Sequence, residues 1–447
     1  MNTTRRRLLG VLCTAGLGGI AGCGRYGPFG STSSDSADDA LGGTQASKLV
    51  PPAEGSAERF GRSVAITGAG QMAIVGSPFD EQPNGFRSGS AYVYERAGNS
   101  WDQQNKIAPN DGGGNDHFAS VVSVSEDGET ALFGAPYDEE GTEETESTDP
   151  GSAYVFAYTD GSWRQTSKLT GDNSEATDRF GRNVALSADG NTAVVSAPRE
   201  VTAERRGALY VYARQGDSWT RQAKFTDGDG FVDAFGKSVA VSGDGTVVAV
   251  GAENVNASPT TPETGARQPF RAGVVLVFER NDETWTRQAK LTAPDGDEED
   301  FLGQSVTVSK AGRTVVAGAP RDDVAAGSAH VFERSNDIWD HQAKLTPSDD
   351  DTKDYFGGAV TVSGEGAVVV VGAPGDEDPN GSGAGSAYAF RRSNGSWEEY
   401  AKLTADDGDS EDAFGAAVAV SSDGSAALVS AYMDDDSSGG GSAYIFD

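Results

Sequence analysis

One motif recurs seven times along this chain, and this repetition constrains the fold more than any other feature. Each unit opens with a phenylalanine followed by glycine, or with an equivalent pair. We call the first residue of each pair the marker, and the markers are Phe60, Phe118, Phe180, Phe235, Leu302, Phe356 and Phe414. Their separations are 58, 62, 55, 67, 54 and 58 residues. Repeats of this length indicate stacked or radially arranged units rather than independent domains.

Four short apolar runs, separated by turn signals, make up each unit. In the fourth unit we expect strands A to D over residues 237–242, 246–250, 273–278 and 285–292, with a Gly-Asp-Gly turn at 243–245. Such a turn between two apolar runs is typical of a tight hairpin. Each unit is therefore predicted to form a four-stranded antiparallel sheet.

The two ends of the repeated region carry complementary half-units. The last unit stops after strand C, at residues 441–446, and residues 44–50 match a strand D with no unit before them. A ring whose last sheet takes its missing strand from the other end leaves no exposed edge strand there, whereas a linear solenoid leaves both half-units unexplained. We predict an all-β fold, a seven-bladed β-propeller of four-stranded antiparallel blades over residues 44–447, closed by the N-terminal strand.

The sequence Gly-Ala-Pro closes strand B at residues 134–136, 318–320 and 372–374. Together with the Phe-Gly pairs, it resembles the FG-GAP repeats of the integrin α-subunit head and of many microbial surface proteins. The resemblance covers about residues 44–447 and implies a propeller with a role in adhesion, although fold does not fix function. The Gly-Ala-Pro motif is altered at Ser77, Ser196, Glu253, Ser430 and Tyr432.

The N-terminus is predicted to be an export signal followed by a lipid anchor. Its Arg-Arg pair at 5–6 resembles a twin-arginine signal, and Ile-Ala-Gly-Cys at 20–23 resembles a lipobox. We expect residues 1–22 to be a signal peptide, Cys23 to be lipidated and residues 23–43 to form a flexible tether. The protein would then lie at the outer face of the cytoplasmic membrane. An ordinary signal peptide with an incidental cysteine is the alternative.

Strong negative charge excludes several partners. The chain has 35 Lys and Arg against 68 Asp and Glu, a net charge of −33. Nucleic acids and anionic membrane surfaces need a basic face, so we expect no nucleic-acid binding and membrane attachment only through the lipid. An acid-rich surface with only ten lysines is typical of a protein that stays hydrated in molar salt, which indicates a halophile.

Two charged positions recur in every unit. An acid lies two residues before each marker: Glu58, Asp116, Asp178, Asp233, Asp300, Asp354 and Asp412. A lysine lies 11 or 12 residues before each marker: Lys48, Lys106, Lys168, Lys224, Lys290, Lys344 and Lys402. We expect a repeated blade-to-blade hydrogen bond or ion pair, with the acid capping the turn into strand A. The alternative is that these acids bind calcium.

Three acidic loops are the better calcium candidates because they place oxygen ligands at alternate positions, as cation-binding loops do. Their candidate ligands are Asp227, Asp229 and Asp233; Asp295, Asp297 and Glu299; and Asp407, Asp409 and Glu411. Such patterns also arise by chance in so acidic a chain. The calcium signature usual in the FG-GAP family lies in the A–B turn, and the A–B turns of this chain are too short to hold it.

The connections between strands B and C should share one face of the ring with the D–A connections. The B–C loops range from six residues at 321–326 to nineteen at 254–272. Variable loops on a rigid scaffold commonly carry binding sites, so we expect this face to bind a surface protein or a glycan, with the protein a monomer. Six tryptophans share one repeat position, as packing residues or, alternatively, as a platform for sugars: Trp101, Trp163, Trp219, Trp285, Trp339 and Trp397.

No catalytic signature occurs in the sequence. The three histidines, His117, His330 and His341, share no motif, and H-E-x-x-H, G-x-S-x-G and phosphate-binding loops are absent. We therefore expect no enzymatic activity and no cofactor other than calcium. The alternative is an exported propeller enzyme, such as a quinoprotein-type oxidoreductase or a hydrolase.

Overall fold

The computed structural model describes 41–52, 58–139, 150–172, 178–201, 206–226, 235–253, 271–349, 351–377, 379–435 and 440–447. Residues 39–447 form one compact unit. The predicted signal peptide, Cys23 and most of the predicted tether lie outside the described residues. Among the described residues, no helix is both long and apolar enough to cross a membrane.

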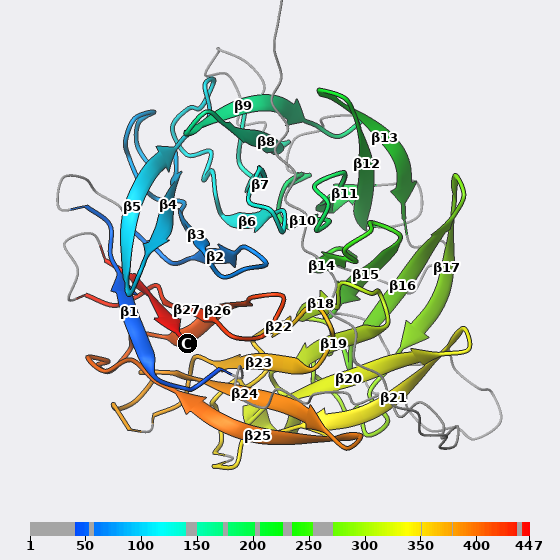
Figure 1. The fold of residues 1–447 in the computed structure, drawn as a ribbon. Coiled ribbons are helices and arrows are strands. Elements are labelled where there is room, and N and C mark those ends of the chain that lie inside the picture. Colours follow the sequence, from blue (N-terminus) through cyan, green and yellow to red (C-terminus); the bar gives the residue numbers. More distant parts are fainter. Residues whose placement is uncertain are drawn as a thin grey trace, which may run out of the picture. The chain divides into compact units, whose positions relative to one another are not determined.

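Seven four-stranded antiparallel sheets surround a central axis, which confirms the predicted propeller (Figure 1). Strand A is innermost in each blade. From blade 1 to blade 7 the A strands are β2 (Ser63–Ile66), β6 (Val121–Val124), β10 (Val184–Leu186), β14 (Ser238–Val241), β18 (Ser305–Val308), β22 (Ala359–Val362) and β26 (Phe414–Val420). The B strands are β3 (Met72–Ser77), β7 (Thr130–Ala135), β11 (Thr192–Val201), β15 (Val247–Ala252), β19 (Thr314–Ala319), β23 (Val368–Ala373) and β27 (Ala427–Ala431).

In blades 1, 2, 4, 5 and 6 the outer two strands are longer than the inner two and are joined by a tight turn. The C strands are β4 (Ser90–Ala97), β8 (Ser152–Thr159), β12 (Arg206–Gln215), β16 (Val274–Asn281), β20 (Ser328–Ser335), β24 (Ser386–Ser393) and β28 (Ser442–Phe446). The D strands are β5 (Ser100–Ile107), β9 (Ser162–Leu169), β13 (Ser218–Phe225), β17 (Thr284–Leu291), β21 (Ile338–Leu345), β25 (Ser396–Leu403) and, in blade 7, β1 (Gln45–Leu49).

The N-terminal strand closes the ring as predicted. β1 pairs antiparallel with β28, with Lys48 opposite Tyr444 and Leu49 opposite Ala443. Figure 1 shows β1 beside the C-terminal end of the chain. The Gly42 N–H also donates to the Asp447 carbonyl at 2.8 Å. The two ends of the repeated region therefore complete one blade between them, and no edge strand is left at the seam.

Close contacts between blades explain the repeated Phe-Gly and Gly-Ala-Pro sequences. The marker Phe356 is fully buried and packs edge-on against Tyr388, with ring centroids 5.6 Å apart. A side chain at Gly318, the glycine of one Gly-Ala-Pro, would collide with the Gly357 carbonyl of the next blade. Only glycine lets the two backbones approach this closely.

The hydrophobic core lies between the blades rather than within them. Seven clusters of buried side chains each combine residues of two adjacent blades. Each tryptophan is half-buried on a D strand and packs against one of these clusters, as Trp163 does against the cluster of blades 1 and 2. Their shared position is therefore a packing position between blades.

Backbone hydrogen bonds close a ring around the axis at the face that carries the A–B turns. Seven N–H groups each donate to the A–B turn of another blade. Gly243 donates to Lys310 at 2.9 Å and Lys310 donates to Gly364 at 3.0 Å. The series returns to its start where Ser422 donates to Gly68 at 2.9 Å. This face is therefore built from the same contact in every blade.

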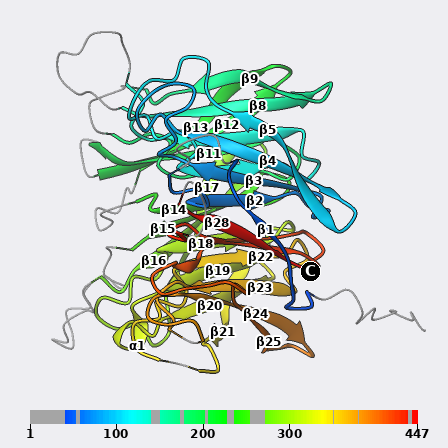
Figure 2. The same cartoon turned by 90° about the vertical axis from the view of Figure 1, so that its left-hand side faces the viewer.

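The B–C and D–A connections emerge at the opposite face, which we call the loop face. Among the described residues the only helix is α1 (Asp322–Ala325), which belongs to the B–C connection of blade 5 and marks this side of the ring (Figure 2). Both kinds of connection meet here because strands alternate in direction across each blade.

Candidate functional site

The outer part of the loop face carries the repeated lysines. In six blades the lysine Nζ lies within 2.9 Å of a buried acid near the end of strand B or just after it. The pairs are Lys48–Asp434, Lys106–Asp80, Lys168–Asp138, Lys224–Glu200, Lys344–Asp322 and Lys402–Asp376. We call these six sets the lysine clusters.

Five of these lysines also contact an acid from the preceding blade. The second partners lie in D–A connections: Asp407 for Lys48, Asp111 for Lys168, Asp172 for Lys224, Asp295 for Lys344 and Asp349 for Lys402. The Lys402 Nζ lies 2.5 Å from Asp349 and 2.9 Å from Asp376. Each such lysine therefore links two blades, through acids other than those two residues before the marker.

A tyrosine on strand C completes five of the clusters. The hydroxyls of Tyr92, Tyr154, Tyr210, Tyr388 and Tyr444 donate to the same buried acids at 2.6 to 3.0 Å. Burial alone would lower the pKa of Lys402, but its hydrogen bonds to Asp349 and Asp376 raise that pKa above its usual value. The Lys402 ammonium group therefore stays charged over the whole neutral range.

Blades 4 and 5 depart from this arrangement. In the sequence of blade 4, Val255 stands at the position of the buried acid and Leu276 at that of the tyrosine. In blade 5, His330 replaces the tyrosine, and its ring lies 3.1 Å from Ser328 Oγ and 3.0 Å from His341 Nε2. Burial lowers the pKa of His330 to about 4, so this histidine is neutral at pH 7.

The acids two residues before the markers bind backbone N–H groups in the D–A connections. Carboxylates of Asp116, Asp300, Asp354 and Asp412 each accept the N–H of the residue three positions earlier, at 2.5 to 3.2 Å. Burial, with a further contribution from the charge of Asp138, raises the pKa of Asp116 to about 7. Burial likewise raises the pKa values of Asp354 and Asp412 to about 6.

Lysine side chains contact a carboxylate in two of the three candidate calcium loops. Asp295 contacts Lys344 at 2.8 Å, and Asp407 contacts Lys48 at 2.6 Å. The backbone N–H groups of Asp297 and Asp409 donate to the carboxylates of Asp300 and Asp412, the acids two residues before the next markers. Glu299 lies 3.8 Å from Arg271, and the Glu411 N–H donates to the Ser382 carbonyl.

The third candidate loop, with Asp227, Asp229 and Asp233, lies outside the described residues. Within the described ranges, no group of three or more His, Cys, Asp or Glu side chains is placed to hold a metal ion. Calcium binding stays a prediction for all three loops.

At the centre of the loop face a cavity of about 600 Å³ opens onto the propeller axis. We call it the mouth. Its floor is a ring of valines, one from the A strand of each blade: Val64, Val122, Val184, Val239, Val306, Val360 and Val418. Above this ring, Ser63 and Ser238 hydrogen-bond to carbonyls of the next blade at 2.9 and 2.8 Å. These two layers are part of the scaffold.

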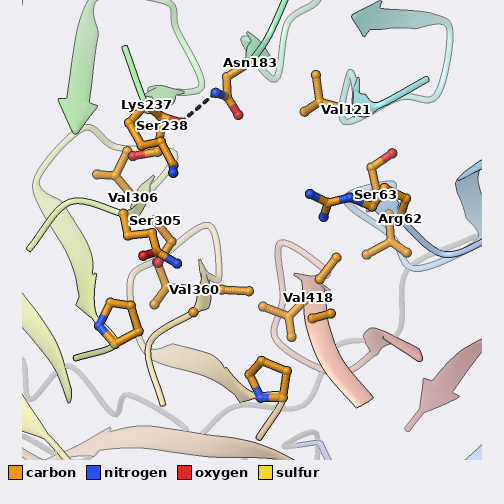
Figure 3. A pocket seen from close by; sticks show the side chains of 18 of the residues that line it. Arg62, Ser63, Val121, Asn183, Lys237, Ser238, Ser305, Val306, Val360 and Val418 are labelled. Atoms are coloured by element: carbon orange, nitrogen blue, oxygen red, sulfur yellow. Dashed lines mark hydrogen bonds between the residues drawn. The ribbon is translucent and has the colours of Figure 1, made fainter. Parts of the chain in front are cut away.

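The layer two residues after the markers differs from blade to blade. From blade 1 to blade 7 it reads Arg62, Ser120, Arg182, Lys237, Gln304, Gly358 and Ala416, and all seven line the mouth. Figure 3 shows Arg62 and Lys237 on opposite sides of the opening. Arg321, which follows strand B of blade 5, adds a fourth cation.

The charge of the mouth is opposite to that of the molecule. None of the described residues that line it is Asp or Glu. Lys237 pairs with Glu253 at 2.9 Å. Arg62 stacks on Tyr432 and Arg321 on Phe301, with guanidinium carbons 5.5 and 5.0 Å from the ring centroids.

Arg182 lies among like charges. Burial and the nearby Arg62, Arg179 and Arg199 lower the pKa of Arg182. Among the residues that the structure describes, no carboxylate pairs with Arg62, Arg182 or Arg321. The mouth therefore has positive charge that the protein itself does not neutralise.

The sequence prediction missed two sets of residues. The buried acids of the lysine clusters lie 20 residues after each marker in six units, as Asp376 does after Phe356, and this constant spacing could have revealed them. The cations of the mouth leave a weaker signal because they occur in only some of the repeats. They become visible only when the seven units are aligned on their markers.

Seven segments of the chain match the FG-GAP repeat family: residues 44–94, 101–156, 163–212, 219–266, 285–332, 339–390 and 397–446. Together they cover more than half of the sequence. The chain matches no curated protein.

Proposed function

The chain belongs to the FG-GAP repeat family, and from that premise we propose that it is a binding protein of the cell surface. In this proposal the protein is exported, attached to the membrane through Cys23, and monomeric. It binds a surface protein or a glycan through the loop face and catalyses no reaction. FG-GAP propellers are typical of binding and adhesion proteins, which supports this class of function without naming the ligand.

The observation that carries the proposal is the contrast between a constant scaffold and a variable loop face. The A–B and B–C strand pairings have the same antiparallel arrangement in every blade. The B–C connections, in contrast, differ about threefold in length, from 321–326 to 254–272. Rigid frames that present variable loops are common in binding proteins.

The export part of the proposal is tested with the full chain in a host that has twin-arginine export. The wild-type protein should remain with the membrane fraction and be cleaved by protease added to intact cells. The Cys23→Ser variant should be released. Protection from protease on intact cells would contradict export, and membrane retention of Cys23→Ser would contradict the lipid anchor.

The binding part is tested with the released Cys23→Ser protein in molar KCl. We expect saturable binding to isolated cell envelopes that unlabelled protein displaces. Absence of saturable binding would contradict a role in adhesion or envelope assembly.

We also propose calcium as a ligand of the acidic loops. Calcium would have to displace Lys344 from Asp295 and Lys48 from Asp407. Millimolar calcium should raise the melting temperature relative to magnesium, since a ligand of the native state stabilises it. The single substitutions Asp229→Asn, Asp297→Asn and Asp409→Asn then identify the loop that binds calcium, because the substitution in that loop should remove the rise. No calcium-specific rise would overturn the proposal.

A further inference from the structure

The mouth has the features of a ligand site rather than of a structural channel. Its volume of about 600 Å³ lies within the range of small-molecule sites, which are typically about 300–1,000 Å³. Its polar groups converge from several blades above an apolar floor of valines. This inference deepens the proposed function and rests on it, because it names the chemistry of the ligand that the loop face would take.

The mouth concentrates positive charge in an acidic molecule. Several cations outside it form close ion pairs, such as Arg334 with Glu279 at 2.9 Å and Arg96 with Asp447 at 2.5 Å. The chain has 68 acidic residues. The mouth is nevertheless lined by four cations and, among the described residues, by no carboxylate.

The donors are gathered on one arc of the mouth. Blades 1 to 5 supply Arg62, Ser120, Arg182, Lys237 and Gln304 at the same repeat position, whereas blades 6 and 7 supply Gly358 and Ala416. The hydrogen-bond donors therefore come from five adjacent blades, and the small residues of the other two blades leave space beside them. Such an arrangement suits a ligand group that is held from one side.

Aromatic rings orient two of the guanidinium groups that line the mouth. Arg62 lies over the Tyr432 ring at 5.5 Å, and Arg321 lies over the Phe301 ring at 5.0 Å. A guanidinium that stacks on an aromatic face keeps its N–H edges available for planar, two-point hydrogen bonding.

We propose that the mouth binds an oxyanion group, a carboxylate, sulfate or phosphate, carried by the ligand of the propeller. Arg62 and Arg182 would donate to its oxygens, with Lys237 and Gln304 on the flanking blades. Arginine is the side chain best suited to such groups because its fork of N–H donors matches two oxygens at once. Short-range hydrogen bonds of this kind also persist in molar salt, where charges farther apart than about 3 Å are screened.

The test uses the detergent-solubilised full chain at constant ionic strength in KCl, with acetate, sulfate or phosphate replacing part of the chloride. Calorimetry and thermal melting report binding. We expect at least one of these anions to raise the melting temperature above the chloride reference. A preference for acetate would indicate a planar carboxylate, and a preference for sulfate or phosphate a tetrahedral group.

Two variants and one control locate the site. Arg62→Gln combined with Arg182→Gln should weaken anion binding at least tenfold, and Lys237→Gln should weaken it less. Arg164→Gln makes the same charge change on the exposed outer strand β9 and should leave binding unchanged. The proposal is overturned if no anion exceeds chloride, if the double variant binds like the wild type, or if Arg164→Gln causes an equal loss.

Envelope binding separates this inference from the proposed function. If the wild type and the double variant bind envelopes equally, the oxyanion site is wrong and the binding function stands. If the wild type binds sulfate or acetate but not envelopes, the oxyanion site stands and the proposed function is wrong.

Discussion

The loop face has two concentric zones, and they differ in how they treat charge. In the outer zone, six blades repeat one lysine and one buried acid, and the cation of each lysine cluster is neutralised. In the inner zone, which is the mouth, the position two residues after each marker carries arginine, serine, lysine, glutamine, glycine or alanine. A residue that is repeated from blade to blade stabilises the ring, whereas a position whose residue differs between blades can contribute to ligand binding.

Burial explains why the outer zone varies less from blade to blade than the mouth does. Asp376 is only 4% exposed, and an isolated carboxylate at such a depth would cost several kcal/mol of hydration. All six blades that have the acid therefore keep the lysine, and a hydroxyl also donates to the acid, from the tyrosine in five blades and from Ser328 in blade 5. Blade 4 fits this rule, because Val255 and Leu276 replace the acid and the tyrosine together. None of the four cations of the mouth is fully buried, so hydration can take the place of such partners.

Removing a lysine from the outer zone should have the largest effect on stability. Lys402→Met leaves Asp376 and Asp349 without their cation, and loss of one partner of a buried ion pair costs about 3 kcal/mol. We expect the free energy of unfolding, measured by urea in molar KCl, to fall by this amount.

Lys310→Met is the matched control for that measurement. Lys310 contacts Glu126 on the opposite face, where both side chains are partly exposed, at 47% and 34%. An exposed pair contributes less than about 1 kcal/mol. Equal losses in the two variants would contradict the view that the lysine clusters are buried structural links.

The tyrosine of the same cluster should have a smaller effect. Tyr388→Phe removes hydrogen bonds to Asp376 and Asp349, at 2.6 and 2.8 Å, while the ring keeps its packing against Phe356. A hydrogen bond to a charged group contributes about 1.5 kcal/mol, so urea unfolding should show a loss of this size. Tyr400→Phe is the control, because the Tyr400 hydroxyl is buried and has no hydrogen-bond partner among the described residues. A comparable loss in Tyr400→Phe would show that the cluster hydrogen bonds are not the cause.

The sequence predicts the outer zone better than the inner one, for a physical reason. The same packing contact occurs in each of the seven blades and requires the same type of residue each time. The blades, their strands and the closing strand at 44–50 can therefore be inferred from the repeat. The repeat also reveals the lysines and the acids that accept turn N–H groups, whereas the buried acids that the lysines contact lie 20 residues after the markers. The mouth depends on the sum of unlike residues such as Arg62 and Gln304, which come together only when the ring is closed.

Lowering the pH should stabilise the protein through the buried acids that lie two residues before the markers. Burial raises the pKa of Asp116 to about 7, above its value of about 3.9 in the unfolded chain. Between these values the native state binds more protons than the unfolded state, so stability increases as the pH falls from 8 to 5. Asp116→Asn keeps the acceptor for the Gly113 N–H and removes the charge. We expect it to raise the free energy of unfolding at pH 8, where the wild-type carboxylate is charged, and to have a smaller effect at pH 5.

Paired urea unfolding curves at the two pH values measure this difference. Asp160→Asn, at an exposed C–D turn, is the charge-matched control and should change stability little at either pH. A loss of stability in Asp116→Asn at pH 8 would show that the buried carboxylate is needed as an anion.

The smallest effect on stability should come from the mouth, and its sign should be reversed. Arg182 is close to Arg62, Arg179 and Arg199, and burial together with their charges disfavours its charged form. Arg182→Gln should therefore leave stability unchanged or raise it by up to about 0.5 kcal/mol, with a gain that shrinks as KCl increases and screens the repulsion. Arg334→Gln, which breaks the two-point pair with Glu279, should instead lower stability. If Arg182→Gln destabilises the ring as Arg334→Gln does, the mouth belongs to the scaffold. If the two signs differ, the fold does not need Arg182, and a ligand is the remaining reason for a cation in this position.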